Sequence, residues 1–240
     1  MVLTEAVDIH TPAGLLSAVI HLPERTPAPV VVCCHGLLSS KDSMKYVAVA
    51  EQFCVGGFAV VRFDFSGCGQ STASLAGSLL ESRVRDLESV LGYVASRPWS
   101  KAGRTALFGS SLGGYLALLA AGSGKYDIGA VVCWATPFDL KKVELALERS
   151  EIRGRPFPGG FVLGSPRDLR SVPSVPRVLI VHGQKDEIVP WKEALSIYGQ
   201  VGGSGRLLIM ETADHRFTDP QCRRLAMKAS LDWLRDNLNV

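Results

Sequence analysis

The sequence predicts an α/β fold in which helices cover both faces of a mostly parallel β-sheet. Short runs rich in Val, Ile, Phe and Cys recur along the chain, and such runs are typical of strands buried on both faces. Helical patterns separate these runs, and an alternation of buried strands with helices builds a mostly parallel sheet. The 240 residues contain no linker-like break, so we expect a single domain over residues 1–240.

The expected elements follow one another in a regular order. The first two strands, 3–9 and 15–22, are expected to form a hairpin because the turn sequence Thr11-Pro12-Ala13-Gly14 separates them. Further strands are predicted at 30–34, 58–63, 104–108, 128–134, 178–182 and 206–210. Helices are predicted at 44–55, 80–96, 114–121, 191–200 and 220–238. One face of the helix over 80–96 carries regularly spaced apolar residues, Val84, Leu87, Leu91 and Val94.

Local signals set the ends of the first and last helices. Gly56-Gly57 favours a stop after the first helix, because glycine readily adopts the backbone conformations that end a helix. Asp219-Pro220 is typical of an N-cap followed by proline at the first helical position. The last helix is therefore expected to begin at residue 220.

Residues 109–113 read Gly-Ser-Ser-Leu-Gly and lie directly between the strand at 104–108 and a helix rich in small residues. A G-x-S-x-G pattern between strand and helix is typical of a sharp turn that projects its central serine above the sheet. We therefore predict that Ser111 is a nucleophile. A serine hydroxyl reacts poorly at neutral pH, so a base and an orienting acid are expected elsewhere. Without chemistry, the same residues would form an ordinary glycine-rich turn.

Two residues further along the chain fit the roles of acid and base. Asp186 follows the strand at 178–182 and is expected at the carboxyl edge of the sheet, where Ser111 also lies. His215 is the only histidine after Asp186, so the chain order Ser, Asp, His selects it. We predict that Asp186 holds the His215 imidazole in the productive tautomer and stabilises the imidazolium. The adjacent Glu187 is the open alternative for the acid, and a solvated loop acid and loop histidine are the readings without chemistry.

The loop His35-Gly36-Leu37-Leu38 follows the strand at 30–34. In this arrangement such a loop supplies one oxyanion donor, and the residue after the nucleophile supplies the other. We predict that the backbone N–H groups of Leu37 and Leu112 bind the oxyanion of a tetrahedral intermediate. The remaining histidines are interpreted as structural (His35 and His182) or inert (His10 and His21).

Composition and incomplete motifs argue against other classes of protein. The net charge is only +3 and no basic stripe is present, so no nucleic-acid partner is expected. No apolar stretch approaches the roughly 18 residues of a membrane span, so no membrane partner is expected. The dinucleotide pattern begun by Gly67-Cys68-Gly69 fails at Thr72, and the P-loop-like residues 122–125 fail at Tyr126. We predict no cofactor and no metal, because no metal-ligand spacing occurs.

The six cysteines form no C-x-x-C pair, and no secretory signal pattern begins the chain. Unpaired thiols are typical of proteins in reducing compartments. We therefore expect a cytoplasmic protein. No oligomeric state is predicted.

Together these motifs resemble those of the α/β-hydrolase superfamily. The matching residues are His35-Gly36, Asp64-x-x-Gly67-x-Gly69-x-Ser71, Gly109-x-Ser111-x-Gly113, Gly183-x-x-Asp186-x-x-Val189-Pro190 and Ala213-Asp214-His215. The resemblance implies a central, mostly parallel eight-stranded sheet whose second strand is antiparallel. Within the superfamily the chain is most similar to small carboxylesterases of the feruloyl/cinnamoyl esterase type, and its N-terminal half is similar to serine aminopeptidase-like hydrolases.

The resemblance also implies a lid and an activity. Residues 138–176 occupy the family's lid position, as a short insertion expected to cover Ser111. Phe157 and Phe161 flank a Pro-Gly-Gly stretch and are expected to line an apolar acyl or aryl pocket. The expected function is a serine hydrolase that cleaves a small-molecule carboxylic ester through an acyl-enzyme intermediate. A serine peptidase or amidase, and a catalytically silent binding protein of the same fold, are the alternatives.

Overall fold

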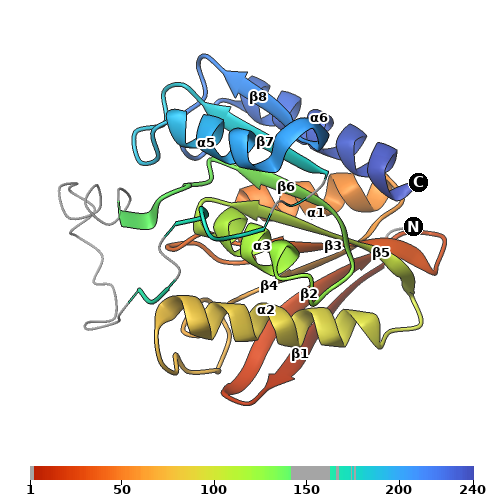
Figure 1. The fold of residues 1–240 in the computed structure, drawn as a ribbon. Coiled ribbons are helices and arrows are strands. Elements are labelled where there is room, and N and C mark those ends of the chain that lie inside the picture. Colours follow the sequence, from red (N-terminus) through yellow and green to blue (C-terminus); the bar gives the residue numbers. More distant parts are fainter. Residues whose placement is uncertain (1–2, 142–162, 166–167, 174, 176) are drawn as a thin grey trace.

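The computed structural model describes residues 3–141, 163–165, 168–173, 175 and 177–240, with an eight-stranded sheet at its centre (Figure 1). The strands are β1 (Leu3–Thr11), β2 (Gly14–Leu22), β3 (Ala28–Cys34), β4 (Ala59–Phe63), β5 (Ser100–Ser110), β6 (Ile128–Trp134), β7 (Val178–Gly183) and β8 (Arg206–Met210). Their order across the sheet is β1-β2-β4-β3-β5-β6-β7-β8. Strand β2 pairs antiparallel with β1 and β4, and all other neighbours are parallel. The predicted fold class is confirmed, including the antiparallel second strand.

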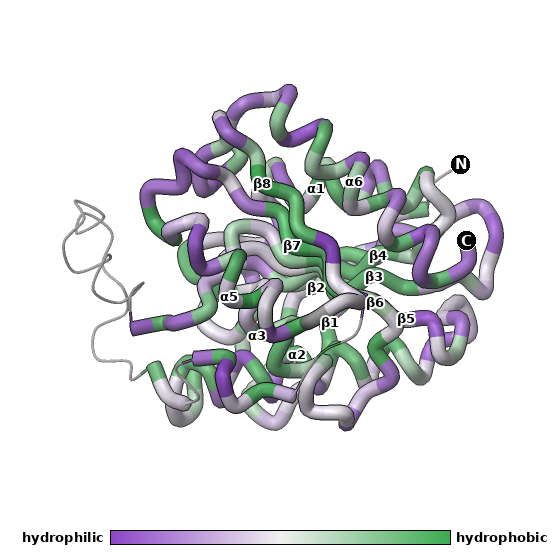
Figure 2. Tube along the Cα trace, turned by 45° about the horizontal axis from the view of Figure 1, so that its top comes forward, coloured by the Kyte–Doolittle hydropathy of each residue, from purple (hydrophilic) through white to green (hydrophobic). Residues whose placement is uncertain are grey.

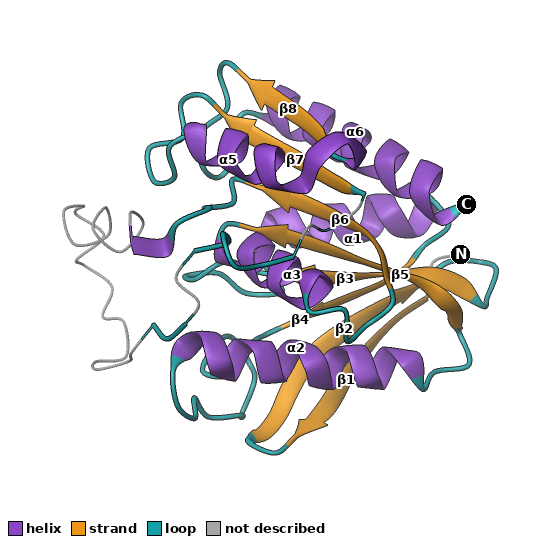
Figure 3. Cartoon of the chain, viewed as in Figure 1, coloured by secondary structure: helices purple, strands orange, loops and turns teal. Residues whose placement is uncertain are grey.

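Helices cover the two faces of the sheet in separate groups (Figure 3). Helices α1 (Met44–Val55) and α6 (Pro220–Leu238) pack on one face, where they form one hydrophobic core with the strands. Helices α2 (Leu79–Ala95), α3 (Leu112–Gly122) and α5 (Lys192–Val201) pack on the other face around a second core. A short 3-10 turn, Gly202–Ser204, follows α5. The parallel strands lie between two apolar layers, which explains their continuous hydrophobic sequences.

Three strands of the sheet are buried on both faces along their whole length. Every residue of β3, β4 and β7 is buried, and Figure 2 shows hydrophobic residues concentrated along the strands at the centre of the molecule. Each fully buried Val or Phe side chain stabilises the fold by about 1.5–3 kcal/mol relative to its exposed state. The edge strand β1 has mostly exposed residues, so the core does not extend beyond it on that side.

The ends of two helices depend on specific caps. The Ser78 hydroxyl accepts the Glu81 N–H, and the Glu81 carboxylate accepts the Ser78 N–H, so the first turn of α2 is closed in both directions. The Asp219 carboxylate accepts the Gln221 N–H, and Pro220 is the first residue of α6, as predicted.

Both ends of the predicted lid are fastened to α5, although most of residues 138–176 lie outside the described residues. Phe138 accepts the Leu169 N–H over 3.0 Å, and Asp139 forms a β-bridge with Asp168. At one end of α5 the Glu193 carboxylate accepts the N–H groups of residues 138 and 139, over 3.1 and 2.9 Å. The stems of the insertion are therefore paired to each other and tied to a single helix.

The second stem is held further along the same helix. The Gln200 side-chain amide donates to the carbonyl oxygens of Leu169 and Val172, over 2.6 and 2.5 Å. Phe157 and Phe161 lie outside the described residues, so their role in a substrate pocket stays a prediction, as does the lid itself.

Candidate active site

Ser111 lies at a sharp turn between the end of β5 and the start of α3. Its backbone angles, φ 56° and ψ −126°, fall in a region that residues other than glycine rarely adopt. A Cβ atom on Gly109 would overlap the carbonyl group of Gly113, and one on Gly113 would overlap the carbonyl oxygen of Cys34. The Ser111 N–H donates to the Trp134 carbonyl over 2.8 Å, which ties the turn to β6. Close packing therefore requires both glycines of the motif.

The N-terminus of α3 presents backbone N–H groups beside Ser111. The N–H groups of Gly114 and Tyr115 donate to the Ser111 carbonyl over 3.0 and 3.2 Å. The N–H of Leu112 comes before them in the chain and has no acceptor within the helix. The positive end of the helix dipole lies at the same point. Leu112 is thus placed at a helix end suited to a developing negative charge.

The loop after β3 also reaches Ser111. A Cβ atom built on Gly36 would lie 3.4 Å from the Cβ of Ser111 and 3.3 Å from the carbonyl oxygen of Ser110. The two backbones are therefore almost in contact. Leu37, the second residue predicted to donate to an oxyanion, follows this point of contact directly.

His35 holds this loop from inside the protein. Burial and the nearby Arg83 cation lower the pKa of His35 to about 3, so its imidazole is neutral. Its Nε2 lies 3.1 Å from the Phe65 backbone nitrogen and its Nδ1 lies 2.7 Å from the Gly36 oxygen. Because the Phe65 N–H can only donate, Nε2 accepts and the ring proton lies on Nδ1, which donates to Gly36. These contacts match the structural role predicted for His35.

Asp186 and His215 form a hydrogen-bonded pair at the carboxyl ends of β7 and β8. The His215 Nδ1 atom lies 2.8 and 3.0 Å from the two carboxylate oxygens of Asp186. The N–H groups of Ile188 and Val189 donate to the same carboxylate over 2.9 and 2.7 Å, and the His182 Nε2 lies 3.2 Å from it. Burial alone would raise the pKa of Asp186, but these hydrogen bonds hold it well below its usual range. The carboxylate is therefore ionised beside His215.

The other carboxylates near His215 have different partners. The exposed Glu187 accepts the backbone N–H of His215 over 3.2 Å, whereas the Asp214 side chain accepts the N–H and hydroxyl of Thr218 over 2.8 and 2.6 Å. Asp186 thus contacts the ring of His215, while Glu187 contacts its main chain. Within the described residues, no hydrogen bond joins the Ser111 hydroxyl to the His215 ring. Such catalytic contacts are often long in a free enzyme and tighten when substrate binds.

The family model for serine aminopeptidase S33 matches residues 25–172, which is more than half of the chain. The chain belongs to this family. Its predicted resemblance to α/β-hydrolases is confirmed by the relatives and structural neighbours that follow. A relative at 31% identity is named a thioesterase, and the chain is a hydrolase of the same fold.

Three similar proteins illustrate the relationship. A mouse protein named palmitoyl-protein thioesterase ABHD10, mitochondrial, is 31% identical to this chain. The alignment covers 88% of this chain and 77% of that protein. The solved structure of mouse α/β-hydrolase domain-containing protein 10 has a TM-score of 0.73 at 27% identity, over 98% of this chain and 99% of that one. Est1E from Butyrivibrio proteoclasticus, solved with ferulic acid, has a TM-score of 0.78 at 20% identity, over 98% and 100% of the two chains. The last likeness shows the fold alone.

In this α/β-hydrolase, sequence reasoning missed a lysine next to the serine turn. The Lys45 ammonium of α1 donates to the Ser110 hydroxyl over 2.6 Å and lies 5.9 Å from the centre of the Trp134 ring. Burial lowers the pKa of Lys45 to about 8, although the Asp186 and Asp214 carboxylates oppose this shift. A lysine on an amphipathic helix gives no sequence signal of such a position.

Sequence reasoning also missed the buried Arg83 of α2. Its guanidinium donates to the carbonyl oxygens of Gly36 and Leu37, over 3.3 and 3.2 Å, and to the Cys68 sulfur over 3.4 Å. It also lies 4.8 Å from the centre of the Phe65 ring. Both carbonyls belong to the loop that approaches Ser111.

The glycine-punctuated loop after β4 supports the same region. The buried Asp64 carboxylate accepts the N–H of Lys41 over 2.7 Å, its ammonium over 3.0 Å and the N–H of Gln70 over 2.9 Å. A Cβ atom on Gly69, which has φ +51°, would overlap this carboxylate. The Asp64-x-x-Gly67-x-Gly69-x-Ser71 motif therefore has a structural role in this α/β-hydrolase: its carboxylate holds the main chain of Lys41 and Gln70.

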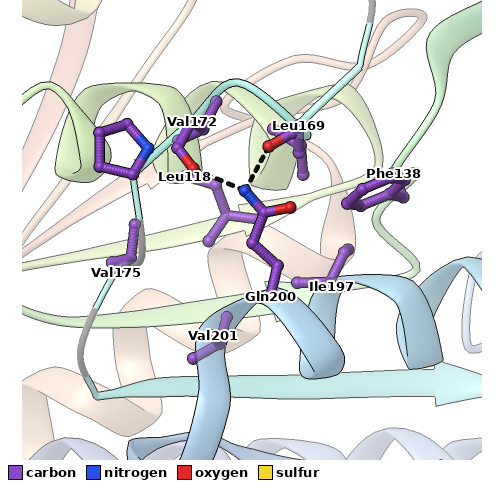
Figure 4. Close-up of a pocket in the computed structure, with 9 residues that line it drawn as sticks. Leu118, Phe138, Leu169, Val172, Val175, Ile197, Gln200 and Val201 are labelled. Atoms are coloured by element: carbon purple, nitrogen blue, oxygen red, sulfur yellow. Dashed lines mark hydrogen bonds between the residues drawn. The ribbon is translucent and has the colours of Figure 1, made fainter.

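A small apolar cavity lies between α3, α5 and the residues 169–173 and 175 (Figure 4). Its volume is about 20 Å³, which is room for roughly one water molecule. It is lined by Leu118, Phe138, Leu169, Val172, Pro173, Val175, Ile197, Gln200 and Val201. No predicted catalytic residue lines it, and Figure 4 shows the Gln200 amide bonded to two main-chain carbonyls there. The cavity therefore lies within the contacts that attach the insertion to α5.

In the part of the chain that the structure describes, no cluster of three or more His, Cys, Asp or Glu side chains is arranged to hold a metal ion. None of the described helices has the length and apolar character needed to cross a membrane. All six cysteines are free, and only Cys68 is even half-exposed.

Proposed function

We propose that this hydrolase cleaves small carboxylic esters through an acyl-enzyme intermediate, with Ser111 as nucleophile, His215 as base and Asp186 as orienting acid. The observation that best supports the proposal is the hydrogen bond between the Asp186 carboxylate and the His215 ring. It occurs at the carboxyl edge of the sheet, where the strained turn carries Ser111. A neutral imidazole held in this way can accept a proton on Nε2.

Acylation then follows from the positions of these groups. His215 Nε2 takes the Ser111 hydroxyl proton as the oxygen attacks the ester carbonyl carbon. The negative charge that develops on the carbonyl oxygen is bound by the N–H groups of Leu37 and Leu112. The ionised Asp186 stabilises the imidazolium. Collapse of the tetrahedral intermediate breaks the ester C–O bond, and His215 returns its proton to the departing alcohol.

Deacylation uses the same residues in a second cycle. His215 removes a proton from a water molecule, whose oxygen attacks the acyl carbon bound to Ser111. The second tetrahedral intermediate expels the serine oxygen, which regains a proton from His215 as the carboxylic acid is released.

Thioesters are the second candidate substrate class. The relative at 31% identity is named a palmitoyl-protein thioesterase, and the same steps cleave a C–S bond with a thiol as leaving group. The serine aminopeptidase family name makes an amide the third. A panel of p-nitrophenyl acetate, p-nitrophenyl butyrate, a palmitoyl thioester and an aminoacyl p-nitroanilide distinguishes them, and we expect the largest kcat/KM for an oxygen ester.

The proposal is tested by Ser111→Ala, with Ser110→Ala as the matched control. Loss of the nucleophile should lower kcat by about 10⁴-fold or more, because only the oxyanion donors and substrate binding then accelerate hydrolysis. Ser110→Ala should stay within about tenfold of wild type. A fluorophosphonate probe should label wild type and S110A but not S111A. A folded S111A protein, checked by circular dichroism, with nearly wild-type activity would remove Ser111 from this role.

We also propose a cytoplasmic location. All six thiols are unpaired, which suits a reducing compartment. Cell fractionation with compartment markers tests it, and recovery with mitochondrial markers would contradict it.

A further inference from the structure

Arg83 carries a formal charge into the interior of the protein. The residue is 1% exposed, and burial lowers its pKa from the usual arginine value. Within the described residues no carboxylate lies within ion-pair distance of its guanidinium, and its Nε has no hydrogen-bond partner. Asp86, one turn further along α2, instead accepts the N–H and hydroxyl of Ser66 over 2.7 and 2.8 Å. A buried, unpaired cation is unfavourable for stability, so its contacts call for a functional explanation.

The contacts of Arg83 concentrate on one loop. Nη1 donates to the Gly36 carbonyl and Nη2 to the Leu37 carbonyl, while the Cys68 sulfur is its only other hydrogen-bond partner in the described structure. The Gly36 carbonyl also accepts the His35 Nδ1–H. Two donors from different elements therefore fix the direction of this one carbonyl.

The direction of the Gly36 carbonyl sets the direction of the Leu37 N–H. Both groups belong to one planar trans peptide, in which the C=O and N–H bonds point in opposite directions. With the oxygen turned toward Arg83 and His35, the N–H of Leu37 points away from them. The backbone at Gly36 is almost in contact with Ser111. The cation also draws electron density toward the carbonyl oxygen, which strengthens the N–H as a donor.

We infer that Arg83 is a positioning residue for the oxyanion hole, whose guanidinium holds the Gly36 and Leu37 carbonyls so that the Leu37 N–H faces the ester oxygen at Ser111. The inference rests on the proposed function, because it needs an oxyanion to form there. Arg83 touches no reacting atom and acts through the loop. Its loss should weaken binding of the transition state more than binding of the substrate.

The test compares Arg83→Met and Arg83→Lys with Cys68→Ala as the matched control. Cys68→Ala removes the third partner of the guanidinium and leaves both carbonyl contacts in place. For p-nitrophenyl acetate, kcat of R83M should fall about 10- to 100-fold, below the effect of deleting an oxyanion donor outright, with KM within about threefold of wild type. R83K should be intermediate, since an ammonium cannot hold both carbonyls as a guanidinium fork does. C68A should stay within about twofold of wild type.

A second readout separates positioning from stability. An alkyl boronic acid forms a tetrahedral adduct with an active serine, so its inhibition constant should rise by the same factor by which kcat/KM falls. Activities are normalised to the folded fraction measured by circular dichroism. If R83M does not fold, R83K decides the question alone. Wild-type kcat and wild-type boronate affinity in R83K, or a raised KM with unchanged kcat, would overturn the inference.

Ser111→Ala is assayed in parallel to separate this inference from the proposed function. An inactive S111A with fully active Arg83 variants refutes the role of Arg83 alone. An active, folded S111A refutes the proposed function, and the inference falls with it.

Discussion

His35 and His182 are buried histidines on the two sides of Ser111 in the sheet. His35 follows β3 and His182 lies near the end of β7, and these strands lie on opposite sides of β5. Both rings are completely buried, and both contact a main-chain carbonyl, Gly36 in one case and Val189 in the other. The charge beside them differs: the cation Arg83 lies on the first side, and the anion Asp186 lies on the second.

The difference matches the role that we propose for each loop. The loop at Gly36 is proposed to offer an N–H group to the oxyanion, and the cation Arg83 binds the carbonyls of that loop. The loop at Asp186 is proposed to offer a carboxylate to His215, and backbone N–H groups donate to that carboxylate. One buried histidine thus lies beside a cation and the other beside an anion. Their hydrogen bonding also differs. Both ring nitrogens of His35 have partners, whereas Nδ1 of His182 has no partner among the described residues.

The largest effect is expected from Asp186→Asn on the anionic side. The amide cannot stabilise the imidazolium and favours the wrong tautomer of His215, and in Ser-His-Asp hydrolases this change lowers kcat by about 10⁴-fold. Glu187→Gln is the matched control, because Glu187 contacts only the main chain of His215. Its kcat should stay within about tenfold of wild type. Steady-state hydrolysis of p-nitrophenyl acetate measures both.

The opposite ranking would reverse the comparison. If Glu187→Gln lost more activity than Asp186→Asn, with both proteins folded, the acid that orients His215 would be Glu187 and not Asp186.

The two histidines should differ in their contribution to stability. His35→Ala leaves the buried Phe65 N–H without an acceptor and removes one donor from Gly36, so we expect the free energy of unfolding to fall by about 2–4 kcal/mol. His182→Ala removes a ring that already has one unpartnered nitrogen, and we expect a loss of about 1–2 kcal/mol. Urea denaturation at pH 7 measures both values. Equal losses would show that hydrogen-bond completeness does not distinguish the two sides.

Acid should destabilise the two sides in different pH windows. In the unfolded chain His35 protonates near pH 6.5, whereas in the folded protein its pKa is about 3. Between these values the unfolded state binds more protons, so stability falls as pH is lowered, by up to about 1.4 kcal/mol per pH unit. The pKa of Asp186 is depressed on folding, so its contribution is lost only at lower pH, below the unfolded carboxyl pKa of 3.8.

Urea midpoints at pH 7, 6, 5 and 4 test this separation. His21 contributes a similar slope down to about pH 4, because burial and the Arg62 cation lower its pKa to that value. In His35→Ala the free energy of unfolding should therefore depend less steeply on pH. The part of the dependence that is due to His35 should be lost, and the part due to His21 should remain. An unchanged slope in this variant would contradict the burial of a neutral His35.

The smallest effect is expected from Lys45→Met, between the two sides. Folding lowers the pKa of Lys45 from 10.5 to about 8, so the unfolded chain binds more protons between these values. Wild type should therefore gain stability relative to K45M as pH rises from 8 to 10.5. Near pH 7 the lost hydrogen bond to Ser110 offsets the removal of a partly buried charge, and activity should change less than tenfold. Thermal unfolding from pH 7 to 10.5 measures the difference.

Much of this fold could be predicted because local signals coincide with the tertiary structure. Helix α1 and strand β8 have the predicted bounds, and α6 begins at Pro220 as its N-cap sequence indicates. Strand β5 is longer than predicted, from residue 100 and not 104, because its first part contains exposed polar and small residues, which carry no hydrophobic signal.

Some residues of the candidate site could be predicted from the sequence, and others could not. The positions of Ser111, Asp186 and His215 follow from strand ends and chain order, and the hydrogen bond expected between Asp186 and His215 is present. Their catalytic roles stay predictions. Arg83 was not predicted, because an arginine within a helix belongs to no catalytic motif and charged residues are mostly exposed.

The helix face of α2 shows why. Its buried residues are Leu79, Leu80, Ser82, Arg83, Asp86, Leu87, Val90, Leu91 and Val94, whereas Val84, expected on the buried face, is only half-buried. The helical spacing therefore places Arg83 within the buried stripe. Its partners come from elsewhere in the chain, chiefly the two carbonyls of the loop more than 40 residues earlier, and the spacing along the helix does not reveal them.

The attachment of both insertion stems to α5 makes this part of the chain suitable for exchange between relatives. Because Asp139 is paired with Asp168 and both stems are bonded to the same helix, the sheet does not depend on the length of what joins them. Closing a longer flexible loop is inexpensive, since each doubling of its length costs only about 0.6 kcal/mol. A chimaera that carries a relative's segment between residues 139 and 168 should thus keep its sheet, so the predicted lid could change without loss of the fold's stability.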